Sequence, residues 1–317
     1  MPGERGHEVP LAKPRSVVEN ARTMKMAFRI LTRLTAAGTL LALVSCGHKQ
    51  VFQVKGVVEE VRAADHKLKI AHEKIPGYMD AMTMTFDVKG PGELTALQRG
   101  DTISFRMVVT DKDGWIEQIQ KLAAAAPVIA AAPDNFRRAR EVDPLNLGDP
   151  LPEYHFTNEL GRAVSLGDFK GQALAFTFIF TRCPFPTFCP RMSGNLGEAA
   201  KKLQALPDAP ANWHLLSISF DPAYDTPAVL KGYAEKLDYD PKRWSFVTGD
   251  LIDVTALAEQ FGLLFWRPDP SQAAGISHNL RTVVIDARGR VQKVFKENEW
   301  KPDDLVAEIV KAAQAKP

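Results

Sequence analysis

Two cysteines, Cys183 and Cys189, stand where an apolar strand pattern gives way to a helical one. Residues 173–180 form the continuous apolar run of a buried parallel strand. Pro190 then begins a helix that extends to residue 205, because proline is favoured in a first helical turn. The partial positive charge at a helix N-terminus favours thiolate over thiol. Two such thiolates can form a disulfide or hold a soft metal ion; the alternative is that they are two unrelated buried residues.

A second group of soft donors lies earlier in the chain. Met82 and Met84 alternate along a predicted strand at 82–88 and therefore lie on the same face of it. Met79 precedes them, and His72 ends the strand before. Thioether and imidazole groups together suit a soft metal ion. The alternative is that the two methionines only pack the interior of a small barrel.

The third cysteine, Cys46, belongs to an export signal. Basic residues precede an apolar core at 34–45 that is far shorter than a membrane span. The sequence Leu-Val-Ser-Cys46 resembles a bacterial lipobox, which implies cleavage before Cys46 and a lipid on its sulfur; the alternative is a signal peptide that ends near an unrelated cysteine. Outside the cytoplasm, Cys183 and Cys189 would oxidise unless a reductant or a metal prevents it.

Around these residues the chain divides into four segments. Residues 1–46 hold an N-terminal extension and the signal peptide, and residues 123–147 form an Ala/Pro-rich linker. Between them, residues 48–122 alternate polar and apolar positions between turn signals. This pattern predicts a small all-β, OB-like barrel of five strands at 51–61, 67–72, 82–88, 102–109 and 115–120.

Residues 148–317 alternate strands with helices. The predicted strands are 173–180, 214–220, 244–248, 281–286 and 290–295, and the predicted helices are 191–205, 227–237, 251–261 and 302–313. Residues 287–289 join the last two strands as a hairpin. The fold class is therefore an α/β thioredoxin-like domain preceded by the small all-β barrel.

The second domain resembles the Sco/SenC family of copper-delivery proteins. The resemblance rests on Phe178-Ile-Phe-Thr-Arg-Cys-Pro, on Cys189-Pro, on the segment from Ser217 to Pro227, and on Ser-His278. It implies that Cys183, Cys189 and His278 bind one copper ion. Five residues separate the cysteines here, where the family usually has three. The longer loop either still lets the sulfurs converge or shifts the balance towards disulfide exchange.

Two features of this domain have plainer alternatives. His278, taken alone, could be a loop histidine whose nitrogens bind the backbone. Asp221 and Asp225 follow a strand and are expected to cap the helix that starts at Pro227, with orientation of a ligand or recognition of a partner as the alternative.

The segment from His72 to Phe86 resembles the copper-binding motif of CusF-type periplasmic domains. The resemblance implies that His72, Met82 and Met84 bind Cu(I) or Ag(I). Met79 stands where that family has a tryptophan over the metal, which offers an extra sulfur ligand in place of an aromatic cover.

The composition is ordinary for a soluble globular protein, and it bounds the class of the protein but not its function. The 317 residues carry a formal net charge of +2, without a basic stripe that would indicate nucleic acid. We predict a bacterial lipoprotein, anchored by lipid and facing the periplasm or cell exterior, that binds copper as Cu(I), Cu(II) or both. By resemblance, the recipient is the copper-centre subunit of cytochrome c oxidase. A carrier is favoured over an enzyme; the alternatives are a thiol-disulfide oxidoreductase that keeps oxidase cysteines reduced and a protein that only sequesters copper.

Overall fold

The computed structural model describes residues 48–122, 141–267 and 275–315. Gly47–Pro317 forms one compact unit. The predicted signal peptide, Cys46 and most of the linker lie outside the described residues. Within the described ranges, none of the helices combines the length and the apolar character that crossing a bilayer requires.

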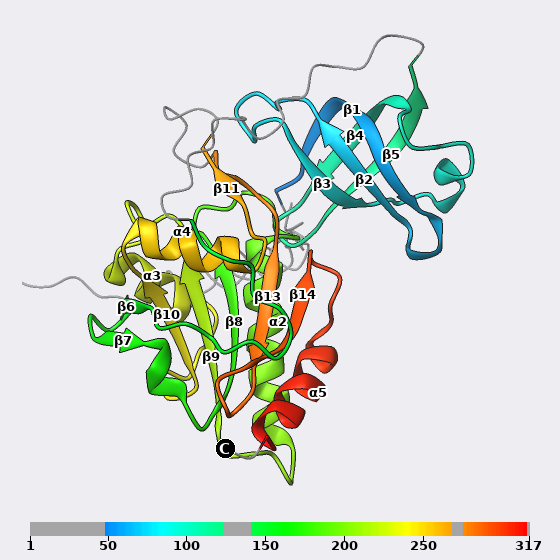
Figure 1. Cartoon of the computed structure of the whole chain (residues 1–317). Coiled ribbons are helices and arrows are strands. Elements are labelled where there is room, and N and C mark those ends of the chain that lie inside the picture. The colour runs from blue at the N-terminus through cyan, green and yellow to red at the C-terminus, as the bar shows by residue number, and fades with distance from the viewer. Residues whose placement is uncertain (1–47, 123–140, 268–274, 316–317) are drawn as a thin grey trace, which may run out of the picture. The chain divides into compact units, whose positions relative to one another are not determined.

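The first described segment is a five-stranded antiparallel barrel (Figure 1). Its strands follow the order β3-β2-β1-β4-β5 across the sheet. The sheet closes after β3, where Val88 bridges to Ile116 and the Lys89 N–H donates to the Ile116 carbonyl over 3.0 Å. The strands are β1 (Gln50–Arg62), β2 (Lys67–His72), β3 (Met82–Asp87), β4 (Thr102–Val109) and β5 (Gly114–Lys121), with 3-10 turns η1 (Ala63–Asp65) and η2 (Pro91–Leu94). The prediction of a small five-stranded β domain is confirmed.

The larger segment is built on a seven-stranded sheet of order β14-β13-β8-β9-β10-β6-β7. Strands β8, β9 and β10 are parallel, and β13 runs antiparallel to β8. The predicted elements are β8 (Ala173–Ile179), α2 (Cys189–Ala205), β9 (Trp213–Ser219), α3 (Pro227–Glu235), β10 (Trp244–Thr248), α4 (Leu251–Gln260), β13 (Arg281–Ile285), β14 (Val291–Lys296) and α5 (Pro302–Ala313). The thioredoxin-like expectation is confirmed.

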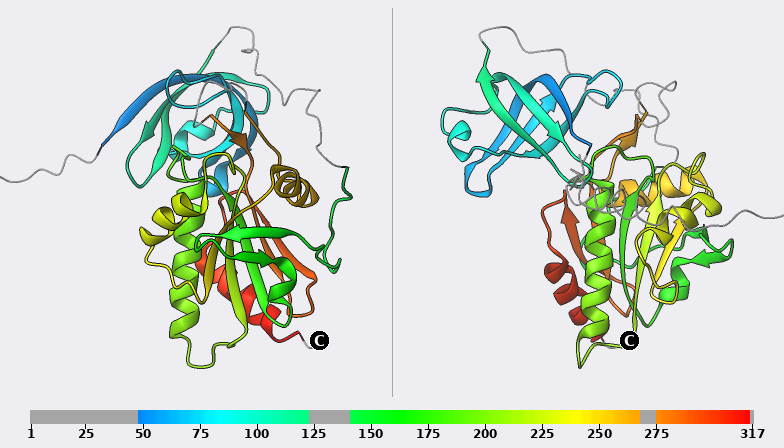
Figure 2. Two further views of the ribbon diagram at one scale, coloured as in Figure 1. Left: turned by 90° about the vertical axis from the view of Figure 1, so that its left-hand side faces the viewer. Right: turned by 180° about the vertical axis from the view of Figure 1, so that it is seen from behind.

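Helices cover both faces of this sheet (Figure 2). Helices α2, α3 and α5 share one face, where the Ser193 and Tyr233 hydroxyls of α2 and α3 lie 2.9 Å apart. Helix α4 covers the other face. Successive right-handed crossovers from β8 to β9 to β10 place α2 and α3 on the same side, and the return towards β13 places α4 opposite.

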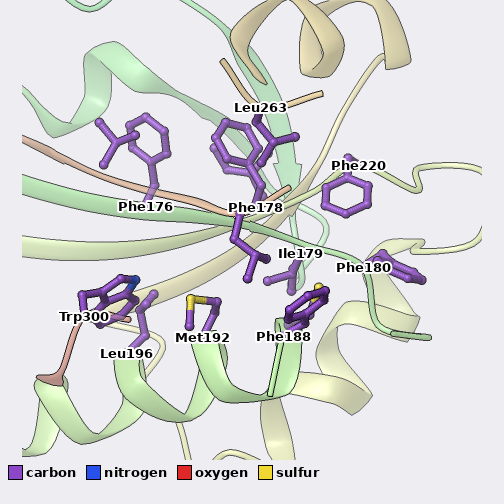
Figure 3. Packing of buried hydrophobic residues seen from close by; sticks show 14 of the residues in the cluster. Phe176, Phe178, Ile179, Phe180, Phe188, Met192, Leu196, Phe220, Leu263 and Trp300 are labelled. Carbon is purple, nitrogen blue, oxygen red and sulfur yellow. The ribbon is translucent and has the colours of Figure 1, made fainter. Parts of the chain in front are cut away.

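Strand β8 is buried on both faces, as its apolar run predicts. Figure 3 shows Phe176 and Phe178 on one side of it, and Met192 and Leu196 of α2 near Ile179 on the other. This packing fixes the carboxyl end of β8 against the N-terminus of α2. The segment that carries the two cysteines joins these two fixed points.

Four strands and one turn were not predicted from the sequence. They are β6 (His155–Asn158), β7 (Ala163–Ser165), β11 (Phe265–Trp266), β12 (Ser277–His278) and the 3-10 turn η3 (Leu166–Phe169). Each strand has at most four residues, so it carries too little period-two pattern to stand out. One of them, β12, positions His278.

His214 in β9 gives this domain a pH-dependent stability. Its ring packs on Phe169 at 4.7 Å between centroids, and its Nε2 lies 3.0 Å from the Ser245 hydroxyl. Burial, with a smaller contribution from the charge of Arg243, lowers the pKa of His214 to about 4. The unfolded chain has a pKa of about 6.5 and binds the proton first, so stability falls as the pH drops from about 6.5 towards 4.

The free energy of unfolding of the wild type should fall between pH 7 and pH 4.5. We expect this fall to be smaller by about 2–3 kcal/mol in His214→Gln, which has no imidazole to protonate. Urea unfolding of both proteins at the two pH values measures it, and comparing the differences cancels the contributions of other groups. An unchanged pH dependence in the variant would show that His214 is protonated as easily in the folded protein as in the unfolded chain.

Candidate metal centre

The two cysteines lie on either side of a short connection between β8 and α2. Cys183 ends a turn after β8, in which its N–H donates to the Phe180 carbonyl over 3.3 Å. Cys189 is the first residue of α2, two positions before the predicted range of 191–205, with Pro190 in the first turn. Cys183 is half-buried and Cys189 fully buried, and both are free thiols.

His278 reaches this connection from a two-stranded sheet in which it pairs with Phe265. Its Nδ1 lies 2.9 Å from the Asn279 carbonyl. A carbonyl only accepts, so Nδ1 carries the proton and Nε2 keeps a free lone pair. That Nε2 lies 3.9 Å from the sulfur of Cys189.

The ligand atoms of Cys183, Cys189 and His278 all lie within 4.8 Å of one another. The five-residue connection therefore brings the sulfurs together, as the sequence interpretation required. Two thiolates and one neutral imidazole form a three-donor set that suits a soft ion such as Cu(I).

Aromatic rings enclose His278. The rings of Phe180, Phe188 and Phe220 have centroids 5.0–5.9 Å from the imidazole centroid. Figure 3 shows Phe180 and Phe220 beyond the end of β8 and Phe188 at the start of α2. These rings exclude water, hold the imidazole orientation and lower the local polarity, all of which favour soft covalent ligation over hydration.

The pKa values of the two thiols are shifted in opposite directions. Burial by itself raises the pKa of Cys183, but the hydrogen bond from Cys189 opposes burial, and the pKa of Cys183 lies well below its usual value. Burial raises the pKa of Cys189 well above its usual value, and the hydrogen bond and charge of Cys183 raise it further. Cys183 is therefore the thiolate of the pair, and Cys189 is the thiol that donates to it.

The expectation that Asp221 or Asp225 caps α3 is wrong. Thr226 is the N-cap, and its side chain accepts from the Val229 N–H. Asp221 instead pairs with Arg182 at 2.6 Å and Arg267 at 3.0 Å. An ion pair with two guanidinium groups holds this carboxylate more strongly than a helix N-terminus would.

Asp225 is fully buried beneath the turn that carries Cys183. It accepts hydrogen bonds from the Thr181 N–H at 3.1 Å, from the Thr181 hydroxyl, and from the Ser219 hydroxyl at 2.6 Å. Burial raises the pKa of Asp225, and these hydrogen bonds oppose the rise. The carboxylate thus fixes the backbone two residues before Cys183.

We expect Asp225→Asn to weaken Cu(I) binding about 10–100-fold, the size of effect seen when support behind a metal ligand is lost. The amide of asparagine has one oxygen in place of two, so it accepts fewer of the hydrogen bonds from Thr181 and Ser219, and its NH2 group faces one of these donors. The mismatch also lowers the free energy of unfolding by about 1–3 kcal/mol. Chelator competition and urea unfolding measure the two effects. Asp250→Asn, at the N-cap of α4, is the control and should change neither much. Wild-type copper affinity in Asp225→Asn would show that the turn does not depend on this carboxylate.

The barrel brings its predicted donors onto one buried face. His72 lies directly opposite Met82 across β2 and β3, and Met84 follows two residues later on the same face. All three are at most 7% exposed. Met79 is also buried, at a bridge with Ile75.

The imidazole of His72 has the form that a metal ligand requires. Its Nδ1 donates to the Glu73 carbonyl over 2.7 Å, so Nε2 carries the lone pair. This Nε2 is buried and has no hydrogen-bond partner among the described residues. Burial lowers the pKa of His72 to about 4. A buried acceptor without a donor is costly unless something binds it, and a soft cation fits.

Sequence reasoning did not identify the groups that orient these donors. Thr181, Arg182 and Arg267 near the cysteines, and Phe188 and Phe220 around His278, were not singled out. Their roles depend on contacts between residues far apart in the chain, and no local period or spacing signals them.

Comparison with known proteins gives two family matches. Residues 145–314 match the family model SCO1/SenC, and residues 51–121 match the model of the copper binding periplasmic protein CusF. The SCO1 protein homolog of Bacillus subtilis is 30% identical over 178 residues, which cover 55% of this chain and 87% of that protein.

Solved structures of Sco proteins match the same part of the chain. A structure described as a disulfide switch in BsSco, a member of the Sco family of cytochrome c oxidase assembly proteins, is 29% identical with a TM-score of 0.46, covering 55% of this chain and 98% of that one. Yeast Sco1 with copper bound is 25% identical with a TM-score of 0.44, covering 54% and 90%. The copper expectation is confirmed by the match to the copper binding protein CusF and by the cluster of Cys183, Cys189 and His278, which could hold a metal ion. The bacterial relative and the periplasmic CusF match indicate the cell envelope.

Proposed function

This chain belongs to the SCO1/SenC family, and on that premise we propose that it is an exported, lipid-anchored copper carrier. The copper that it carries goes to the copper centre of cytochrome c oxidase. A similar protein, BsSco, is described as a member of a family of cytochrome c oxidase assembly proteins. Cys46 carries the lipid, which keeps the carrier at the membrane that holds the oxidase.

One observation carries the proposal: Cys183, Cys189 and His278 place three soft donors within 4.8 Å of one another at the end of β8. Cys183 is half-buried, whereas Cys189 is fully buried, so a recipient thiolate or imidazole can approach the ion from the side of Cys183. Release then occurs by ligand exchange, in which each new bond from the recipient replaces one bond to the carrier.

The barrel serves as the site of copper capture in this proposal. His72, Met82 and Met84 offer no thiolate, so Cu(I) held by them keeps its positive charge and binds less tightly than at a pair of cysteines. A gradient from thioether to thiolate drives copper from the barrel to the cysteine site. The same gradient keeps free copper low outside the cell membrane.

The test is transfer to the isolated copper-binding domain of the oxidase subunit. Copper-loaded carrier is mixed with reduced apo-domain, and the product is then oxidised with ferricyanide, because a centre filled with Cu(I) alone is colourless. The oxidised mixture should show the absorption of the assembled centre, and Cys183→Ser should abolish it. An apo-domain that stays colourless while the carrier retains its copper would contradict the proposal. A gene deletion that impairs copper resistance but leaves oxidase assembly intact would favour copper sequestration.

The acidity of the thiols favours a second candidate function, thiol-disulfide exchange. A half-buried thiolate beside a fully buried thiol has the arrangement of an attacking and a resolving cysteine. Turnover on a disulfide form of the apo-domain that persists in His278→Ala would support this function, because exchange needs the two sulfurs and copper needs all three donors.

A further inference from the structure

The residues between the two cysteines pack against the barrel within the compact unit. Phe185 is 1% exposed, and its ring meets that of Phe86 edge to face at 6.1 Å between centroids. At Gly114 of β5 an added Cβ would lie 2.9 Å from the Phe185 ring, so a glycine is needed for this approach. The Tyr78 hydroxyl donates to the Pro184 carbonyl over 3.1 Å. The connection is therefore a docking element as well as a spacer.

The first turn of α2 contacts the barrel as well. Arg191, two residues after Cys189, pairs with Asp87 at 3.4 Å and Asp113 at 3.0 Å. The guanidinium group is about one-quarter exposed and the two carboxylates are more exposed, so these ion pairs contribute little to stability. Their main effect is to orient the first turn of α2 against the barrel. Together with Phe185, they hold the cysteine-bearing connection against the strands that carry the methionines.

A cavity of about 20 Å³ lies at this junction, enough for one water-sized species. The barrel lines it with Met79, Asp80 and Met82, and the larger domain lines it with Cys183 and His278. The cavity thus brings together one predicted ligand from the barrel and two from the cysteine site. Met79 adds a thioether that neither donor set uses.

Two buried polar atoms of residues that line the cavity have no hydrogen-bond partner in the described part of the chain. Asp80 is 4% exposed; its Oδ1 pairs with Lys74, but its Oδ2 has no hydrogen bond among the described residues. The Ser277 hydroxyl, 1% exposed, has none there either. The buried carboxylate favours a positively charged occupant through its charge, while the ligands that suit Cu(I) at this cavity are the sulfur and imidazole groups.

We propose that this cavity is a transfer site through which Cu(I) passes from the barrel to the cysteines without entering bulk water, with Met79 as the ligand that holds the ion in transit. The inference rests on the proposed function. Copper stays Cu(I) throughout. Its bonds to His72 and Met84 break as Met79 and the Cys183 thiolate bind, and Met82 is the last barrel ligand to leave. Cys189 then binds through its sulfur, releasing its proton to the buffer, and His278 completes the site.

The longer connection between the cysteines has a function in this scheme. Phe185 belongs to it and fills the space beside Gly114. A connection that carries its own docking side chain places Cys183 at the same cavity as Met82 and Met79. The departure from the usual family spacing is thus the feature that couples the two copper sites.

The test follows formation of the Cu(I)–thiolate absorption after reduced full-length protein is mixed with one equivalent of Cu(I). In wild type the step should be first order, independent of protein concentration, and not intercepted by excess bathocuproine disulfonate. Met79→Leu, which keeps the side-chain volume, should slow it about tenfold or more, equal to about 1.4 kcal/mol of barrier. Met107→Leu, at a buried barrel methionine away from the cavity, is the control and should leave the rate unchanged.

A second pair of variants tests docking. Phe185→Ala and, on the surface, Arg191→Ala should make transfer slower and sensitive to the chelator. Arg191→Ala leaves the core intact, so it remains informative if Phe185→Ala misfolds. Copper stoichiometry on the same samples distinguishes failure of the proposed function from failure of the transfer site. A wild-type chain that binds one copper in place of two overturns the proposed function. If Met79→Leu and Arg191→Ala each bind two copper ions and transfer copper at the wild-type rate, the proposed transfer site is wrong while the proposed function stands.

Discussion

Cys183→Ser should weaken Cu(I) binding at the cysteine site about 1000-fold or more, roughly 4 kcal/mol. A serine hydroxyl is a hard, protonated donor at neutral pH and cannot replace a thiolate on a soft ion. Serine is only slightly smaller than cysteine, so the change in packing is small. The loss of Cu(I) affinity is large because Cys183 supplies the thiolate of the pair. Chelator competition under anaerobic conditions measures it, in a Met82→Leu/Met84→Leu background that leaves one site to count.

Met192→Leu is the matched control for this variant. Met192 lies in α2 close to Cys189, is fully buried, and packs near Ile179 (Figure 3). The substitution removes a sulfur from the same helix without removing a ligand, and costs little stability because the volume is kept. An equal loss of affinity in both variants would mean that Cys183→Ser acts through packing and that copper does not bind the thiolate.

Met82→Leu with Met84→Leu should abolish tight Cu(I) binding by the barrel, again by about 1000-fold or more. The double variant leaves His72 as the only donor of the predicted set, and a single imidazole does not hold Cu(I) tightly. The barrel should stay folded, because leucine fills nearly the same volume. Competition titration in a Cys183→Ser/Cys189→Ser background measures the loss, and circular dichroism verifies the fold.

Met107→Leu is the control here as well, since Met107 in β4 is buried in the same barrel but lies outside the predicted ligand set. A barrel that binds Cu(I) equally in the double variant and the control would mean that the two methionines only fill the interior. That was the plainer alternative for the Met-x-Met pattern.

The sequence was sufficient to predict the elements that carry the ligands, because their patterns are local. The apolar run of β8 and the proline after Cys189 marked the strand, the turn and the helix. Period-two alternation put Met82 and Met84 on one face. His278 was different: its strand β12 has two residues, so its place beside Cys189 came only from the family resemblance.

The carboxylates show where local rules fail. Aspartate and threonine are both good N-caps, so a sequence with Asp225 next to Thr226 cannot distinguish them by propensity. The structure selects Thr226 because Asp225 is buried with Thr181 and Ser219, which lie elsewhere in the chain. The burial of Phe185 against Gly114 is likewise a contact between distant residues, and no spacing rule reveals it.

Copper-edge X-ray absorption of the full chain, compared with its Cys183→Ser/Cys189→Ser variant, distinguishes the ligands of the two copper sites. We expect two Cu(I) per chain in the wild type, with thiolate sulfur and imidazole at one site and thioether sulfur and imidazole at the other. The double variant should bind one Cu(I) and lose the thiolate contribution while keeping the thioether one. A variant that still binds two Cu(I) with an unchanged spectrum would contradict ligation by the cysteines.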